Sequence, residues 1–114
     1  MKGCRSGRGG RLSKARLESL VDEATVDAYG EEEQLCGFFT MIEENLHVPF
    51  LTQVLGVEVT VTRIEMTELD EIVATCSRGK QNQNISILEL PLRAPPPEGA
   101  EWIEAYRYWR RGGR

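Results

Sequence analysis

The spacing of the hydrophobic residues changes at Pro49, and this change constrains the fold more than any other feature of the chain. Before Pro49 the apolar residues recur every three or four positions, as on one face of a helix. After it they alternate with polar residues, as in a strand that is buried on one side. Helical spacing returns after the proline-rich residues 91–97. The order helix, helix, short strands, helix predicts an α+β fold.

Two helices are expected before Pro49, and together they form an N-terminal helical hairpin. Ser13 is a good N-cap, and the first helix is expected to run from there to about Tyr29, with Gly30 as its stop. Glu31 opens the second helix, with three acids in the first turn, where the helix dipole favours them. Pro49 ends this helix.

The middle of the chain predicts several short antiparallel strands. They are expected over residues 50–55, 57–62, 72–78 and 84–90. The apolar alternation changes phase near Arg63, which predicts a β-bulge that bends the sheet. Strands this short, with a bulge, suit a small bent antiparallel sheet of the SH3-like open-barrel kind.

A final helix is expected over residues 98–110, with one apolar face formed by Trp102, Ile103, Tyr106 and Trp109. The aromatic residues alternate with arginines, a pattern that also occurs in proteins that bind single-stranded nucleic acid. A shared helical face is the ordinary sign of core packing, which is the interpretation we favour. Tyr108 falls off that face and is expected to be exposed.

Composition predicts one domain with a basic extension. Residues 1–12 are rich in glycine and arginine and are expected to form a disordered arm, whereas residues 13–111 form a single domain. No apolar stretch approaches the ~18–20 residues that span a bilayer, so no membrane partner is expected. The three cysteines form no CxxC pair, which favours a cytoplasmic location. Cys36 and Cys76 are expected to fill the core.

The charges are distributed unevenly. Residues 17–62 carry ten carboxylates and no lysine or arginine. Residues 17–106 hold all 18 acids and four bases, an excess of 14 negative charges (18 − 4). Six further bases lie in residues 1–16 and four in residues 107–114. Such a field repels nucleic acid and attracts cations or basic proteins.

Several acids stand where a cation would relieve repulsion. Asp27 lies one expected turn after Glu23 and four residues before Glu31, and like charges at that spacing cost about 0.2–0.5 kcal/mol per pair. Glu43 and Glu44 stand at the end of the second helix, where negative charge is unfavourable. Calcium takes six to eight oxygen ligands, so these acids suit it. The alternative interpretation is a solvated acidic face.

Two further acidic groups are weaker candidates. The group around the expected bulge and turn is a possible second and looser site; its members are Glu65, Glu68, Asp70 and Glu71. Turn acids often have local roles, however. The last helix holds Glu98, Glu101 and Glu104, for which local roles are favoured, including a pair between Glu104 and Arg107.

Enzyme motifs are absent from the sequence. His47 is the only histidine, which excludes HExxH and sites built from several histidines. The chain has no GxSxG and no glycine-rich phosphate loop between a strand and a helix. It also lacks the DxDxDG loop of an EF-hand. A pair of carboxylates acting as general acid and base is the remaining enzymatic alternative, and we predict that the protein is not an enzyme.

Three segments carry a family resemblance: EATVDAYGEEEQLCGFFTMIEENLHVPF (23–50), VLGVEVTV (54–61) and EWIEAYRYW (101–109). In this order they resemble the CcbP-type calcium-binding family of cyanobacteria. The resemblance covers roughly residues 17–110.

The resemblance implies a small cytoplasmic protein that binds Ca²⁺ through surface carboxylates without an EF-hand, as a buffer or a sensor. The acids that match are Asp27 and Glu31 in VDAYGE, and Glu43 and Glu44 in MIEEN, and these four are the candidate metal ligands. The competing hypothesis is an acidic protein-interaction module that docks a basic partner without metal. Its association would depend on salt and be indifferent to calcium.

Overall fold

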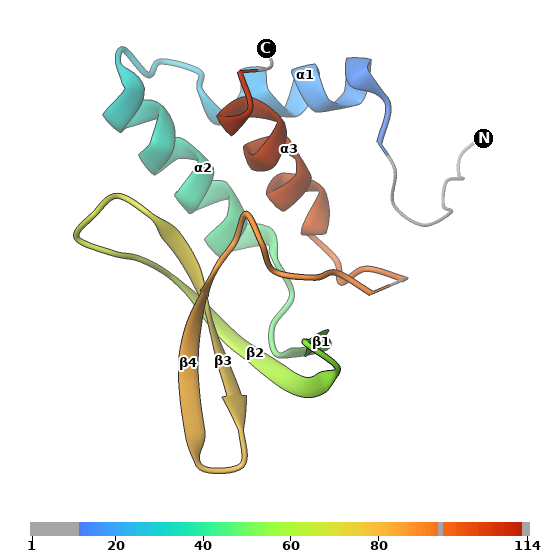
Figure 1. The fold of residues 1–114 in the computed structure, drawn as a ribbon. Coiled ribbons are helices and arrows are strands. Elements are labelled where there is room, and N and C mark those ends of the chain that lie inside the picture. The colour runs from blue at the N-terminus through green and yellow to red at the C-terminus, as the bar shows by residue number, and fades with distance from the viewer. Residues whose placement is uncertain (1–11, 94, 113–114) are drawn as a thin grey trace.

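The computed structural model describes residues 12–93 and 95–112 of the chain. They form three α-helices and one four-stranded antiparallel sheet, which confirms the α+β class (Figure 1). The elements in chain order are α1 (Lys14–Ala24), α2 (Glu31–Asn45), β1 (Phe50–Val54), β2 (Val57–Met66), β3 (Ile72–Arg78), β4 (Gln81–Ser86) and α3 (Ala100–Arg110).

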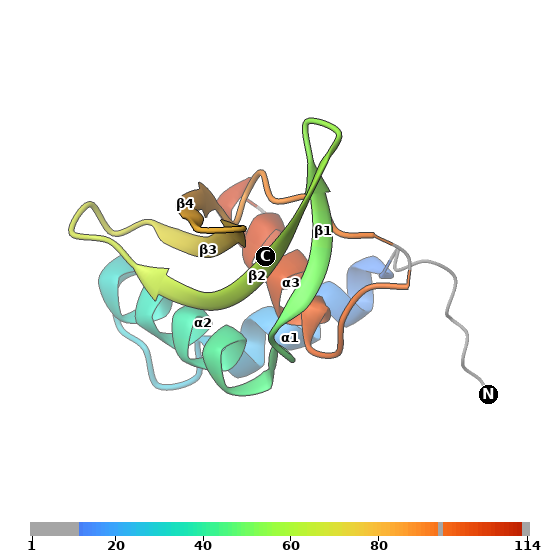
Figure 2. The ribbon, with the colours of Figure 1, turned by 90° about the horizontal axis from the view of Figure 1, so that it is seen from below.

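The helices gather on one side of the sheet, as Figure 2 shows from below. α2 packs against β2 and α3, and α1 packs against both other helices. The β3–β4 hairpin extends away from the helices (Figure 1). Because the helices cover only part of the sheet, the far ends of its hairpins have no helix above them.

α1 begins as predicted and ends earlier than predicted. The Ser13 side chain accepts a hydrogen bond from the Arg16 N–H at 3.1 Å, which is an N-cap. The helix stops at Ala24 and not near Tyr29. The Thr25 hydroxyl donates to the Val21 carbonyl at 2.8 Å, and Asp27 takes a left-handed φ of 63° that a helix cannot contain.

α2 begins at Glu31, as predicted, and ends at Asn45, four residues before Pro49. Leu46 follows in an extended conformation. The buried face of α2 includes Leu35, Phe38 and Ile42. Amphipathic spacing therefore located the helix, and it ends at Asn45, for whose carbonyl Pro49 has no N–H to donate. Beyond that end the chain contacts the segment before α3, described below.

The sheet has the order β1-β2-β3-β4. The pairing of β2 with β3 shifts between Val61 and Arg63, which confirms the predicted bulge. The last strand was expected over residues 84–90 and is observed at Gln81–Ser86. Arg78 pairs with Gln81 across a two-residue turn, so backbone hydrogen bonding to β3 makes a strand of a polar segment that apolar alternation does not mark.

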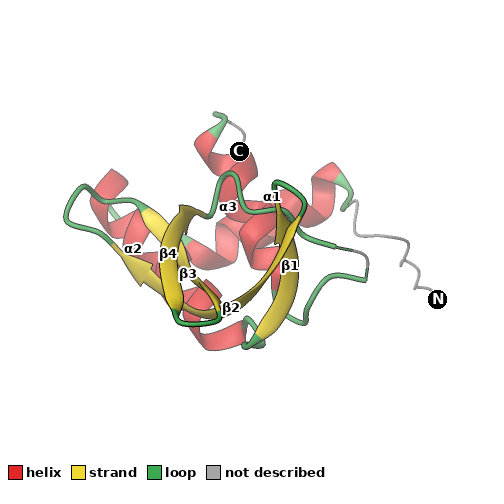
Figure 3. Cartoon of the chain, turned by 60° about the horizontal axis from the view of Figure 1, so that its bottom comes forward, coloured by secondary structure: helices red, strands yellow, loops and turns green. Residues whose placement is uncertain are grey.

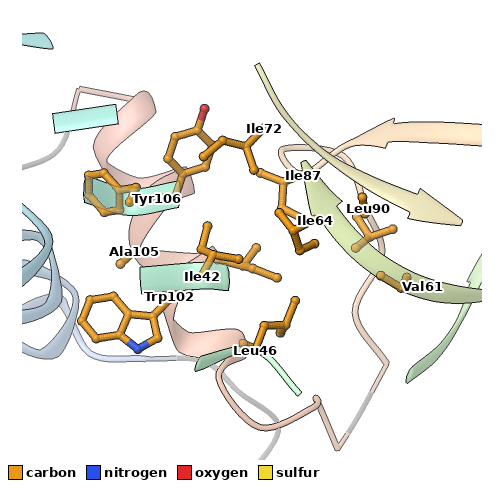
Figure 4. Packing of buried hydrophobic residues seen from close by; sticks show 14 of the residues in the cluster. Ile42, Leu46, Val61, Ile64, Ile72, Ile87, Leu90, Trp102, Ala105 and Tyr106 are labelled. Atoms are coloured by element: carbon orange, nitrogen blue, oxygen red, sulfur yellow. The ribbon is translucent and has the colours of Figure 1, made fainter. Parts of the chain in front are cut away.

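The core lies between the sheet and the helices (Figure 4). Its main members are Ile42 from α2, Leu46 directly after α2, Val61, Ile64 and Ile72 from the sheet, Ile87 and Leu90 from the following segment, and Trp102, Ala105 and Tyr106 from α3. Phe38 is fully buried, with its ring 5.6 Å from that of Tyr106 and 5.0 Å from that of Trp109. The aromatic face of α3 is therefore core, as predicted.

Two single-residue expectations are wrong. Tyr108 is half-buried and its hydroxyl lies 3.1 Å from a carboxylate oxygen of Glu18 on α1. Cys76 fills the core as expected, but Cys36 is exposed, because its neighbours Leu35 and Phe38 occupy the buried face of α2. Both errors concern residues at the margin of a helical stripe, where packing between helices decides exposure.

The predicted arm falls almost wholly outside the described residues, together with Cys4. Leu12, its last residue, is half-buried and packs against the core. Among the helices of the described part, none is long and apolar enough to cross a membrane.

Candidate metal-binding site

The connection between α1 and α2 holds the first two candidate ligands. Asp27 is exposed and lies outside the helix, so the expectation that it shares a helical face with Glu23 is wrong. Glu31 is the first residue of α2 and is also exposed. The structure therefore places Asp27 and Glu31 in one short connection, at the N-terminal end of α2.

The helix dipole explains part of the negative charge in the first turn of α2. Its backbone N–H groups carry partial positive charge, which Glu31, Glu32 and Glu33 complement. A carboxylate oxygen of Glu33 also accepts a hydrogen bond from the Tyr29 N–H at 2.8 Å. A cation would meet the unfavourable end of the helix dipole here.

The other end of α2 has the opposite electrostatics. Glu43 and Glu44 are exposed, and the last turn contains no basic residue. The His47 N–H, which would extend the helix by bonding to the Glu43 carbonyl, donates instead to the Glu98 carbonyl at 2.8 Å. Carbonyl oxygens with partial negative charge therefore end the helix beside two carboxylates. This combination of oxygens suits a hard cation.

The four candidate ligands lie at opposite ends of one helix. Twelve residues separate Glu31 from Glu43, which corresponds to about 18 Å along the helix axis. Calcium holds its ligands at about 2.4 Å, so one ion cannot bind both ends. The sequence-based prediction therefore concerns two separate places, and each of them stays a prediction.

Side chains alone form no cage in the part of the chain that the structure describes. No group of three or more histidine, cysteine, aspartate and glutamate residues is arranged there to hold a metal ion. Any ion at these places would complete its coordination with backbone carbonyls, amides and water, all of which are ordinary calcium ligands.

The β2–β3 loop, the weaker candidate, uses much of its polarity internally. The Thr67 hydroxyl oxygen accepts hydrogen bonds from the N–H groups of Leu69 and Glu71, each at 3.2 Å. Glu65 forms an ion pair with Arg63. Asp70 has a left-handed φ of 61° and is exposed. Most of this group is thus explained by the turn and a neighbouring base.

The structure nevertheless brings this loop to the start of α2, which the sequence did not predict. An open hollow of about 350 Å³ lies between them, lined by Glu32, Glu33, Leu35, Cys36, Met66 and Asp70. Asp70 is thus placed near acids of α2 that are nearly 40 residues away along the chain. No local spacing could have indicated this, because the bend of the sheet and its packing on α2 create the hollow.

One acid of α3, Glu104, has a structural role. Glu104 lies 3.8 Å from Arg107, which confirms the predicted pair. The Arg107 guanidinium also donates to the carbonyls of Ile87 and Leu90, tying the segment after β4 to α3. Burial lowers the pKa of Arg107, and the charge of Glu104 opposes that change.

Taken together, the fold and the exposed acids define a small α+β protein whose surface offers oxygen ligands to a hard cation. A comparison with family profiles identifies the particular family. The CcbP profile, described as calcium binding, matches residues 18–110. The chain therefore belongs to the CcbP family of calcium-binding proteins, which confirms the resemblance and identifies Ca²⁺ as the ion of this family. The family is not one of enzymes.

Solved structures share the fold. The crystal structure of CcbP from Anabaena superposes with a TM-score of 0.71 at 16% identity, over 94% of this chain and 99% of that chain. A calcium-binding protein in its calcium-binding form gives a TM-score of 0.68 at 17% identity, over 91% of this chain and 99% of that one. A search of curated proteins found no match.

Proposed function

We propose that this protein binds calcium in the cytosol through surface carboxylates, as a buffer or a sensor. Membership of the CcbP family over residues 18–110 is the observation that carries the proposal. The excess of acids in the body of the domain supports it, because it attracts divalent cations.

Of the two places that the candidate ligands occupy, the C-terminal end of α2 is favoured. Glu43 and Glu44 lie at the negative end of the helix dipole, with no base in the last turn. The redirected His47 N–H leaves the Glu43 carbonyl available as a further oxygen ligand. Asp27 and Glu31 lie beside the positive end of the dipole, so the same ion gains less there.

Calorimetric titration of the full chain with calcium tests the proposal. We compare the native chain with Glu43→Gln/Glu44→Gln and with Asp27→Asn/Glu31→Gln. Asparagine tolerates the left-handed backbone of Asp27, so that exchange removes charge without strain. The first variant is expected to lose most of the binding heat, and the second less.

The matched control is Glu58→Gln/Glu89→Gln, which removes two charges from β2 and from the segment after β4 and should leave the heat unchanged. Absence of heat from the native chain contradicts calcium binding. An equal loss in all three variants contradicts a defined site and indicates a diffuse charge effect.

An acidic interaction module is the second candidate function. It is favoured by the absence, within the described residues, of a side-chain cluster able to hold a metal ion. This function predicts association with a basic protein that weakens as salt rises and does not change on adding calcium or EDTA.

A further inference from the structure

One concave surface of this acidic protein contains no acid. A groove of about 250 Å³ lies on the sheet, between the β1–β2 turn and the β3–β4 hairpin. Its lining includes the buried Val59 and Cys76 and the exposed Leu55, Val57 and Arg78. None of the residues lining it is Asp or Glu, although the chain has 18 of them. Figure 3 shows β1 and β4 as the two separated edges of the sheet.

An exposed apolar side chain stands at the mouth of the groove at a conformational cost. Leu55 is 97% exposed and has a φ of 54°, followed by Gly56 at 80°. Two-residue hairpin turns of this kind favour asparagine or glycine, and a side-chain-bearing residue there costs about 1 kcal/mol. Val57 beside it is also exposed. Apolar exposure at a strained position is typical of a contact surface.

The bases of the domain body that form no ion pair within the described residues lie in the groove or at the turn beside it. Residues 17–106 contain four bases, of which Arg63 and Arg93 each form an ion pair with a glutamate. Arg78 lines the groove and Lys80 lies at the adjoining turn, and neither forms an ion pair with any residue that the structure describes. This distribution makes the hairpin locally complementary to negative charge.

The strand beside the groove has a free edge. β4 ends the sheet, and its sequence, QNQNIS, contains no charge and no proline. Charged residues and prolines are what usually protect an edge strand from pairing with another chain. An extended segment could therefore add to β4 by main-chain hydrogen bonds while its side chains reach the groove.

We propose that this groove binds an extended segment of a partner protein that carries a large apolar side chain flanked by carboxylates. The apolar side chain packs over Val59 against Leu55, and the carboxylates pair with Arg78 and Lys80. The proposal does not depend on calcium binding, since it uses none of the acids of α2.

A second copy of this chain is a less suitable occupant. Pairing β4 with its own copy would bring the QNQN segment to the groove, and this segment supplies neither a large apolar side chain nor a carboxylate. Nucleic acid is also disfavoured, because two bases at the groove can pair with two carboxylates but not with a long run of phosphates, which the 14 excess negative charges of the domain body (18 − 4) would repel.

To test the proposal, we titrate the isotopically labelled full chain with a short synthetic peptide in which Glu alternates with Val and Phe. NMR chemical shifts and fluorescence anisotropy monitor the binding. A matched peptide carries Lys in place of each Glu. We expect chemical-shift changes on β4, Leu55 and Val59, and binding that weakens with salt. At the groove residues the Lys peptide should bind about tenfold more weakly or worse, since about 1.4 kcal/mol of ion pairing is lost there.

Variants place the binding on the groove. Arg78→Glu/Lys80→Glu should weaken binding of the acidic peptide by at least about tenfold. Lys14→Glu/Arg16→Glu makes the same charge change on α1, where acids are tolerated at a helix start, and should have little effect. Leu55→Asn keeps the left-handed turn and removes the apolar contact, so it should also weaken binding.

Four results would overturn the proposal. They are failure of the acidic peptide to bind, equal weakening by the α1 control, shift changes confined to the helices, and tighter binding of a single-stranded oligonucleotide at the same residues. Sedimentation equilibrium tests whether a second copy of this chain occupies the groove. Self-association that Leu55→Asn abolishes would assign the groove to a second copy and not to a foreign segment.

Discussion

The backbone N–H of His47 donates a hydrogen bond to the carbonyl oxygen of Glu98 at 2.8 Å, and this contact joins the end of α2 to the segment that begins α3. α2 ends at Asn45, two residues before this contact and four before Pro49, and its last carbonyls lie beside Glu43 and Glu44. The candidate calcium ligands favoured above thus lie beside a contact between residues 51 positions apart along the chain.

Substitution of Gly99 should disrupt this junction. Gly99 has a φ of 91°, and a Cβ there would lie 2.1 Å from the Asn45 carbonyl oxygen. We expect Gly99→Ala to lower the free energy of unfolding by roughly 3 kcal/mol in urea denaturation. Gly79→Ala is the control, because its φ of 60° is similar but its surroundings are open, and it should cost about 1 kcal/mol. Equal losses would show that backbone conformation alone matters.

Neutralising the two ends of α2 should change stability in opposite directions when calcium is removed by EDTA. Glu43→Gln/Glu44→Gln removes charge from the negative end of the dipole and should stabilise the protein by about 0.3–1 kcal/mol per residue. Glu31→Gln/Glu32→Gln removes favourable charge and should destabilise it by a similar amount. Thermal unfolding in EDTA measures both; shifts of the same sign would contradict the dipole argument.

Adding calcium should separate the binding role of these acids from their dipole effect. A ligand that binds only the folded state raises its stability according to its concentration relative to Kd. We expect calcium to raise the Tm of the native chain and to lose much of this effect in Glu43→Gln/Glu44→Gln. An undiminished Tm increase in that variant would place calcium elsewhere.

Phe38 should be the most sensitive aromatic position of α2. It is fully buried between the rings of Tyr106 and Trp109. Phe38→Ala should cost about 3–5 kcal/mol of unfolding free energy, because it removes apolar contacts and leaves a cavity. Phe39 is half-buried on the same helix, and Phe39→Ala should cost at most about 2 kcal/mol. Similar values for both would mean that the core does not depend on the aromatic cluster.

Stability should fall in alkali. Burial raises the pKa of the Cys76 thiol above its ordinary value of 9.0. Burial also raises the pKa of Tyr106 above 10.0; the charge of Arg110 opposes this rise and that of Glu71 adds to it. Above these ordinary values the unfolded chain has released protons that the folded chain still holds, so the free energy of unfolding decreases as pH rises.

Urea denaturation at a series of pH values measures this slope. Cys76→Ala should reduce the slope that begins near pH 9, and Tyr106→Phe should reduce the part that begins near pH 10. Slopes are compared within each variant, so a constant loss of packing does not affect the conclusion. Slopes that match the native chain would assign the alkaline loss to other groups.

Sequence reasoning succeeded where local physics decides the outcome. The Ser13 cap, the start of α2 at Glu31 and the bulge beside Arg63 all follow from capping, dipole and alternation rules. It failed where distant contacts decide. β4 is a strand because its backbone pairs with β3, although its residues are mostly exposed and polar.

The candidate site shows the same division. The sequence identified Asp27, Glu31, Glu43 and Glu44 as acids near helix ends, and it identified the family. The prediction treated these four acids as one set, although twelve residues of helix separate Glu31 from Glu43. It also could not place Asp70 beside the first turns of α2, because this arrangement exists only after the sheet bends and packs on the helix.

The sequence alone therefore determined the α+β order, the acidic body and the family, because periodicity, charge and motif order are properties of neighbouring residues along the chain. Only the tertiary structure placed Asp70 of the β2–β3 loop beside the first turn of α2. The tertiary structure also decided that the His47 N–H, just after the end of α2, bonds to the Glu98 carbonyl. It decided as well that an acid-free groove opens between the β1–β2 turn and the β3–β4 hairpin. These features depend on packing between distant segments, which local propensities do not encode.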